Sequence, residues 1–135
     1  ITMDKWTTWR NPISKLRYRI ADRKKLPTIH KYADVIDHMV TSPHRDICTI
    51  PCVIPNWDNT PRSGANGRVL QGSTPELWRQ HLRKAIKIAE SAPPNRRFVF
   101  VKSWNEWAEG NHLEPDLVFG LEYLKVLQHE ISGRK

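Results

Sequence analysis

The sequence predicts a mixed α/β fold built from parallel β/α units. Two apolar runs, residues 47–54 and 97–101, have the composition of strands buried on both faces, as in parallel sheets. Helical patterns alternate with these runs in the order helix, strand, long loop, helix, strand, loop, helix. The 135 residues, 39% of them apolar, suffice for one domain with a core. Two such units cannot close an eight-stranded barrel of about 250 residues, so the chain is part of a barrel or a small open sheet.

The first predicted helix covers residues 28–40. Apolar side chains recur there at three- and four-residue spacing, and Ser42-Pro43 ends the pattern. The preceding segment, residues 6–25, has a similar spacing, but Pro12 interrupts it. We therefore expect a loop or a short helix before residue 28.

The first predicted strand, residues 47–54, contains Pro51 and is followed by Pro55. Proline cannot donate to a strand ladder, so this strand should be bent or short. Residues 56–62 have turn composition and lead into a glycine-containing loop that reaches Gly72.

The second predicted helix starts at residues 73–76, where a hydroxyl cap, a proline and a glutamate occur together. Pro93-Pro94 ends it. Its apolar stripe comprises Trp78, Leu82, Ala85, Ile86 and Ala89.

A last helix follows the second strand and a loop, and it stops near Gly133. Its apolar positions are Leu121, Leu124, Leu127 and Ile131.

Two segments rich in Trp, carboxylate and Asn follow the predicted strands, at residues 57–62 and 104–109. In parallel β/α folds, functional residues lie where strands end and loops begin. Apolar sugar faces stack on aromatic rings, and sugar hydroxyls pair with carboxylates and amides. Both segments therefore have the composition of a sugar-binding site.

Glu106 and Glu109 are the candidate catalytic residues. Cleavage or transfer of a glycosyl unit commonly requires two carboxyl groups, one to donate a proton to the leaving oxygen and one to act as base or nucleophile. Positions three apart share a face of a turn or helix, so this pair could flank one bond. The alternative is that two exposed glutamates in a loop are simply solvated.

The other polar and aromatic members of the two segments are the candidate substrate-binding residues. They are Trp57, Asp58, Arg62, Trp104, Asn105 and Trp107. Asp58 either builds a turn through its side chain or lines the pocket, where Arg62 would hold an anionic or hydroxyl-rich group. The tryptophans either pack in the core or serve as stacking platforms.

The formal net charge is +8, from 22 basic and 14 acidic residues. This balance suits an anionic partner such as nucleic acid, a membrane surface or an acidic sugar, or simply a solvated basic surface. We expect no nucleic-acid partner, because no recognised nucleic-acid-binding motif is present.

We expect no metal or other cofactor. The potential ligands lack a complete set at a recognisable spacing; they are Cys48, Cys52, His112 and Glu114.

Residues 103–110, SWNEWAEG, followed by LEPD at 113–116, resemble the signature of WbsX-like proteins, which are glycosyltransferases of lipopolysaccharide O-antigen and other polysaccharide synthesis. Residues 55–62 and 72–77 resemble the same family in the expected order, and the similarity runs from about Tyr32 to Leu127. The signature is also similar to that of glycoside hydrolase family 99, the endo-acting α-mannosidases and α-mannanases.

In that hydrolase family, a Glu-x-x-Glu pair at the end of the last barrel strand carries the chemistry. The resemblance implies that Glu106 is the base that activates the neighbouring sugar hydroxyl and that Glu109 is the general acid/base. The hydrolases usually have His just before the second Glu, and this chain has Ala108 there, which favours the WbsX-like branch. Glycosyl transfer is therefore the main expectation. Hydrolysis and a non-catalytic carbohydrate-binding role are the alternatives.

The resemblance also implies that residues 1–135 form a single partial domain, the C-terminal part of a (β/α)8 TIM-type barrel with about two β/α units and a preceding helix. The missing N-terminal barrel units would then be needed for activity. The implied partner is a carbohydrate or sugar-linked substrate, and a lipid-linked acceptor would bring the protein to a membrane surface. The implied location is the cytoplasm, free or peripheral at the membrane.

Overall fold

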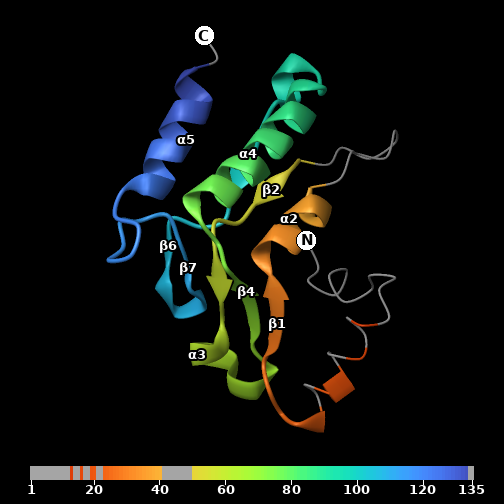
Figure 1. Ribbon diagram of the computed structural model, residues 1–135. Helices are drawn as coiled ribbons and strands as arrows, with labels where there is room; N and C mark the ends of the chain where they lie inside the picture. Colours follow the sequence, from red (N-terminus) through yellow and green to blue (C-terminus); the bar gives the residue numbers. More distant parts are fainter. Residues whose placement is uncertain (1–12, 14–15, 17–18, 21–22, 41–49, 134–135) are drawn as a thin grey trace.

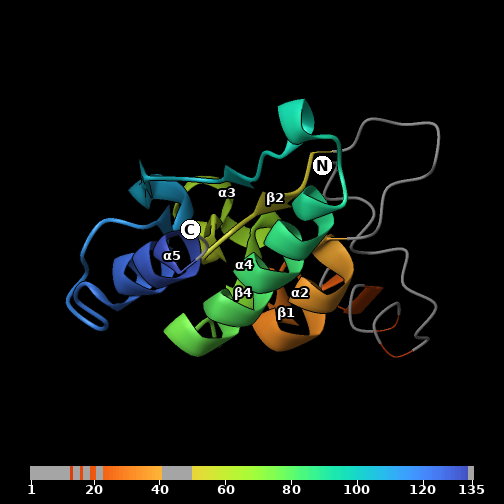
Figure 2. The same ribbon diagram turned by 90° about the horizontal axis from the view of Figure 1, so that it is seen from above.

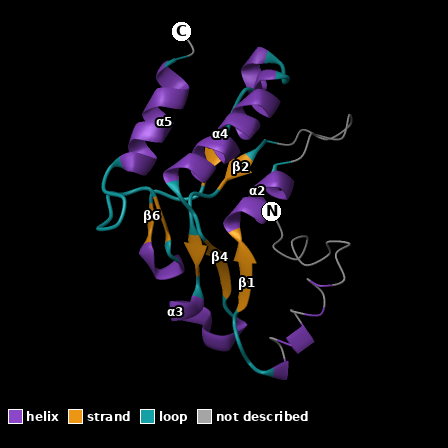
Figure 3. Ribbon diagram, viewed as in Figure 1, coloured by secondary structure: helices purple, strands orange, loops and turns teal. Residues whose placement is uncertain are grey.

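The computed structural model describes residues 13, 16, 19–20, 23–40 and 50–133. Within them, helices and strands alternate, and the mixed α/β class is confirmed (Figures 1 and 3). Most of residues 6–25, where a loop or short helix is predicted, lie outside the described residues. So do residues 47–49 of the first predicted strand, which include Cys48.

Three short strands lie side by side in one sheet, in the order β1-β4-β3 (Figure 1). β1 (Thr28–Lys31) runs parallel to β4 (Arg68–Gln71), and β3 (Trp57–Asp58) runs antiparallel to β4. The helix predicted from residue 28 begins only at Tyr32, because residues 28–31 pair with β4 instead. α2 covers Tyr32–Met39. The loop predicted up to Gly72 likewise contains β4, whose pairing comes from residues distant in sequence.

A second pair of strands is parallel, as the sequence predicts. β2 (Cys52–Val53) pairs with β5 (Phe100–Val101), and the N–H of Lys102 donates to the carbonyl of Val53 at 2.9 Å. The prolines that flank β2 fit its brevity. Phe98 and Phe100 are more than half exposed. The prediction that residues 97–101 are buried on both faces is therefore wrong for the described part of the chain.

The long helix α4 (Pro75–Glu90) lies between α5 and α2 when the molecule is seen from above (Figure 2). It begins where the sequence predicts, because Thr74 Oγ1 accepts from the N–H of Leu77 at 3.3 Å. Four of its five predicted stripe residues are buried, and Ile86 is partly buried. The helix start and its buried face are thus confirmed.

The last helix, α5 (Glu122–Ser132), stops before Gly133 as predicted, and two of its predicted apolar positions, Leu124 and Leu127, pack against the core. Tyr123, Val126 and Glu130 face α4 and the core, while Leu121 and Ile131 are exposed. The sequence pattern does not predict the buried Glu130. Its carboxylate is bound by two arginines of α4, Arg79 at 3.1 Å and Arg83 at 2.9 Å. A buried charge held in this way could not be read from apolar spacing.

The remaining elements are short and carry the loops around the site. They are α3 (Thr60–Ser63), the 3-10 turns η2 (Gly64–Asn66), η3 (Pro94–Arg96) and η4 (Trp107–Glu109), and the strands β6 (Asn105–Glu106) and β7 (Asn111–His112). β6 and β7 form an antiparallel hairpin.

Two apolar clusters form the core of the described part of the chain. The first surrounds Trp78 and includes Tyr123 and Val126 of α5. The second surrounds Tyr32 and Trp57 between α2 and the three-stranded sheet. None of the helices in the described part combines the length and hydrophobicity that a membrane crossing requires.

His81 is a buried base whose protonation should weaken the fold. It lies on α4, 1% exposed, with Nδ1 3.3 Å from the Tyr32 hydroxyl, which donates to the carbonyl of Ile54 at 2.6 Å. Burial lowers the pKa of His81 to about 4. Between pH 6.5 and 4 the unfolded chain therefore binds a proton that the folded chain does not.

We expect the free energy of unfolding to fall by roughly 3 kcal/mol as the pH drops through this window. Urea titrations between pH 7 and 4 measure it, and His81→Asn, which keeps a polar side chain but cannot titrate, should remove most of the slope. His30, whose pKa is also lowered by burial, accounts for the rest. Glu130 acts in a separate window. Its pKa is lowered to about 2, chiefly by Arg83, so its contribution is lost only below pH 4.5. An unchanged slope in His81→Asn contradicts the prediction.

Candidate active site

The segment after β5 folds into a tight hairpin that hydrogen bonds of Asn111, Asn56 and Ser103 hold in place. The Asn111 side chain is fully buried and donates to the carbonyls of Asn56, at 2.7 Å, and Lys102, at 3.0 Å. Asn56 Oδ1 in turn accepts from the N–H of His112 at 2.8 Å. Ser103 Oγ accepts from the N–H of Glu106 at 3.0 Å. The hairpin is therefore fixed to β5 and to the loop after β2.

Gly110 allows the turn η4 to sit directly on β3. Its φ is +49°, and a side chain there would meet the Cβ and backbone of Asp58 at 3.0–3.2 Å. Only glycine combines this backbone conformation with such a close approach at no steric cost. The two segments that the sequence singles out, 57–62 and 104–109, thus lie against each other.

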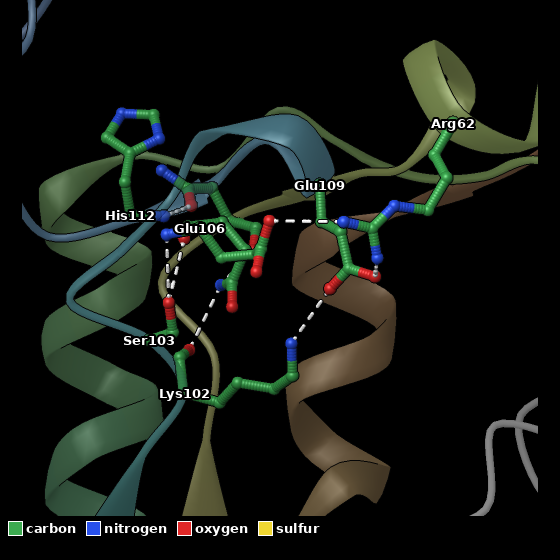
Figure 4. A network of polar contacts seen from close by, with 8 residues as sticks. Arg62, Lys102, Ser103, Glu106, Glu109 and His112 are labelled. Atoms are coloured by element: carbon green, nitrogen blue, oxygen red, sulfur yellow. Dashed lines mark hydrogen bonds and ion pairs between the residues drawn. The ribbon is translucent and has the colours of Figure 1, made fainter.

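Glu106 and Glu109 belong to one charged cluster with Arg62 and Lys102 (Figure 4). Arg62, on α3, lies 3.1 Å from Glu109 Oε1 and 3.5 Å from Glu106 Oε1. Lys102 Nζ lies 3.0 Å from Glu109 Oε2. Both carboxylates therefore face the same guanidinium group, and the sequence spacing of three places them on one side of the turn.

The two carboxylates differ in their surroundings. The Glu109 side chain is 16% exposed and has a cation on each oxygen, whereas the Glu106 side chain is 40% exposed. Among the described residues, Arg62 is the only cation bound to Glu106. A fixed carboxylate beside an accessible one can serve two different roles in proton transfer.

Asp58 builds the turn that carries Arg62. Its Oδ1 accepts from the N–H of Thr60 at 2.9 Å and from the Thr60 hydroxyl at 2.6 Å, at the start of α3. Asn59 Oδ1 accepts from the N–H of Arg68 at 2.6 Å and ties the same turn to β4. The turn interpretation of Asp58 therefore holds, and Asp58 also lines a pocket described below.

The tryptophans have distinct environments. Trp57 is buried, and Lys102 Nζ lies 4.5 Å from the centre of its ring. Trp107 is half exposed, with one face stacked on His112 at 3.8 Å and its Nε1 donating to Glu114 at 2.6 Å. Trp104 and Asn105 are exposed on the hairpin. Trp107 is thus a braced ring with one face available, as a sugar platform requires.

A pocket of about 860 Å³ lies on the Trp107 side of the hairpin. Its polar lining includes Asp58 and the pair His112–Asp116, whose atoms Nε2 and Oδ2 are 3.3 Å apart. Leu117 and Val118 are strongly exposed at the same pocket. Of the six predicted substrate-binding residues, three line it: Trp57, Asp58 and Trp107. Glu106 and Glu109 are not among the described residues that line this pocket.

Asp116 shapes the loop at this pocket. Burial alone would raise its pKa, but hydrogen bonds from the N–H groups of Phe119 and Val118, with His112 nearby, lower the pKa below its usual value. Asp116 therefore closes a turn ahead of α5.

Sequence reasoning missed Lys102, Ser103 and Asn111. Lys102 is the first residue after β5, and this position is itself a signal, because residues at strand ends in parallel folds face the site. Asn111 offers no such signal, since its role depends on a carbonyl 55 positions away along the chain. No cluster of metal-ligating side chains occurs in the part of the chain that the structure describes.

Paired carboxylates and a braced tryptophan at the end of a parallel strand are features of proteins that act on carbohydrates. Comparison with known proteins agrees. Residues 3–127 match the family model of glycosyltransferase WbsX, and the chain belongs to this family. Family membership indicates a carbohydrate-active role.

Two relatives from Xanthomonas campestris pv. campestris are similar over most of the chain. Both bear the description uncharacterized protein WxcX. The protein of strain B100 is 31% identical over 122 residues, and that of a second strain is 33% identical over 120 residues. The aligned parts cover 90% and 84% of this chain but only 18% and 17% of the relatives. No solved structure matches significantly.

Proposed function

We propose that this chain is part of an enzyme that transfers a glycosyl unit during the synthesis of lipopolysaccharide O-antigen or another polysaccharide. One observation carries the proposal. Glu106 and Glu109, at the end of a parallel strand, share Arg62 within one cluster beside a braced tryptophan. This arrangement supplies two carboxyl groups to one bond, as glycosyl chemistry commonly requires.

In the proposed reaction, the bond between the anomeric carbon and the leaving oxygen breaks, and its electron pair stays with that oxygen. Glu109 acts as the general acid/base, giving a proton to the leaving oxygen or taking one from the attacking hydroxyl. Glu106 takes the proton of a neighbouring sugar hydroxyl, whose oxygen bonds to the anomeric carbon as the leaving oxygen departs. The oxygen of an acceptor hydroxyl then bonds to the anomeric carbon and displaces that internal oxygen, which regains a proton from Glu106 while Glu109 takes the proton of the acceptor. When water attacks instead, the result is hydrolysis, which is the alternative activity.

The proposed substrate contacts follow the side chains around this cluster. Arg62 would hold a hydroxyl or anionic group, and Trp107 would stack on a sugar face. The pocket next to Trp107, whose lining includes Trp57 and Asp58, is large enough for a sugar unit. Trp104 and Asn105 would contact the substrate from the outer side of the hairpin.

We further propose that the chain forms the C-terminal part of a (β/α)8 barrel. The relatives are much longer than the aligned region, and the half-exposed Phe98 and Phe100 leave apolar surface around β5. N-terminal barrel units would cover that surface and complete the site. We also propose a cytoplasmic location. The enzyme would be free in the cytoplasm, or at the membrane periphery if its acceptor is lipid-linked.

Product analysis of the full-length protein tests the proposal. The protein is incubated with UDP-glucose, UDP-galactose, GDP-mannose or dTDP-rhamnose and a lipopolysaccharide acceptor, and separately with α-mannan. Mass spectrometry identifies any product. A lengthened acceptor supports transfer, shortened mannan supports hydrolysis, and binding of these glycans without any product supports the non-catalytic alternative. Activity of the isolated 135-residue chain would contradict the need for further barrel units.

A further inference from the structure

We propose that Lys102 is a positioning residue of this site. Its ammonium group packs on the buried ring of Trp57 and holds the Glu109 carboxylate in its reactive orientation. The inference rests on the proposed function of Glu109. It adds a residue outside both segments that the sequence singles out, and it gives the buried ring of Trp57 a supporting role.

The backbone of Lys102 is fixed on both sides. Its N–H donates to the carbonyl of Val53 at 2.9 Å, which continues the pairing of β5 with β2. Its carbonyl accepts from the buried side chain of Asn111 at 3.0 Å. The same asparagine also binds the loop after β2. The point from which the lysine side chain extends is therefore set by the core.

The ammonium group is held by two partners at once. Nζ lies 4.5 Å from the centre of the Trp57 ring, within the range of a cation–π contact, and 3.0 Å from Glu109 Oε2. Trp57 is only 5% exposed, so its ring is a rigid surface rather than a mobile side chain. Lys102 thus connects the buried ring of Trp57 to the carboxylate of Glu109. Figure 4 shows its contact with Glu109.

Lys102 and Arg62 differ in how they would respond to a substrate. Arg62 extends from α3, its side chain is 57% exposed, and it contacts both carboxylates. A sugar that enters between the carboxylates would compete with Arg62 for them. Among the described carboxylates, Lys102 pairs with Glu109 only, on the other oxygen. It can therefore remain in place while an ionised carboxylate, with its spare lone pairs, accepts a further hydrogen bond.

This geometry predicts an effect on turnover rather than on substrate binding. Without Lys102, the Glu109 side chain could rotate away, and a misplacement of about 1 Å can cost on the order of 10²-fold in rate. An interaction that matters mainly in the transition state lowers kcat more than it changes KM.

The experiment compares three variants of the full-length protein, using whichever named sugar nucleotide or α-mannan gives turnover. Lys102→Met keeps the length of the side chain and removes its charge. We expect its kcat to fall about 10- to 100-fold while KM changes less than about 3-fold. Lys102→Arg restores a cation and should recover part of that loss. Lys125→Met is the matched control, because Lys125 pairs only with exposed Glu122 on α5 among the described residues and should behave as wild type.

A second measurement does not depend on turnover. In lysine ammonium NMR spectra of the ligand-free protein, the Lys102 signal should be shifted upfield by the Trp57 ring, and Glu109→Gln should move it. An unshifted signal, or a Lys102→Met variant with normal kcat, overturns the inference. So does a rise in KM alone, which would make Lys102 a substrate-binding residue. If Glu109→Gln itself remains active, the proposed function fails, and that outcome is distinct from a harmless Lys102→Met change.

Discussion

Glu109→Gln is expected to lower turnover by about 10²- to 10⁴-fold, the usual contribution of an acid–base group. Glutamine has nearly the same shape as glutamate, but it cannot take up or release the proton that the reaction moves. Its partners Arg62 and Lys102 are both about half exposed, so water can solvate them once the carboxylate is lost. The fold should therefore persist. Glu106→Gln is expected to have a loss of similar size for the same reason.

Rates of product formation by the purified full-length variants measure this loss, and thermal unfolding confirms that each variant is folded. Glu122→Gln serves as the control, because it removes a carboxylate from an exposed pair on α5. A second measurement uses a bacterial strain from which the gene for this protein has been deleted. Each variant is expressed in that strain, and the amount of surface polysaccharide is measured. Wild-type rates in either site variant would falsify the role of that carboxylate.

The binding alternative makes a different prediction for the same variants. A non-catalytic site should still bind glycan after either glutamate is replaced, and it should lose binding when the exposed face of Trp107 is removed by Trp107→Ala. Calorimetric titration with the acceptor glycan measures this difference. Loss of turnover with retained binding in the glutamine variants favours the enzyme.

Much of the fold could be predicted from local patterns. The start of α4 depends on Thr74 and its neighbours, and its buried stripe follows a helical period, so both are properties of adjacent residues. The strands were harder to predict from the sequence. β1 and β4 form because they pair with each other across 40 positions, and neither has a strong composition of its own. The buried face of α5 was predicted only in part, because Glu130 is stabilised by arginines of another helix.

The candidate site was predictable in part for the same reason. The position of Glu106 and Glu109 after a strand is visible in the sequence, and so is the turn chemistry of Asp58. Their meeting with Arg62 was not visible, because it depends on Gly110 packing against Asp58 across 52 positions. Local sequence thus indicates which groups are available, and the tertiary contacts decide which of them meet.

Trp78→Ala should cause the largest loss of stability in the described part of the chain, and Trp104→Ala provides a control of identical chemistry. Trp78, on α4, is fully buried in the first core cluster, which also includes Tyr123 and Val126 of α5. Removing a buried tryptophan typically costs about 3–5 kcal/mol, because the cavity that remains is only partly filled. Its Nε1 has no hydrogen-bond partner among the described residues, so no hydrogen bond adds to that cost.

Trp104 is more than half exposed on the hairpin, so its replacement should change the free energy of unfolding by no more than about 0.5 kcal/mol. As a proposed substrate contact, it should instead weaken glycan binding. Urea unfolding followed by circular dichroism, together with calorimetric titration of an acceptor glycan, separates the two effects. A Trp104→Ala protein as unstable as Trp78→Ala would place Trp104 in a core, because a side chain that contributes this much stability must be buried in the folded protein.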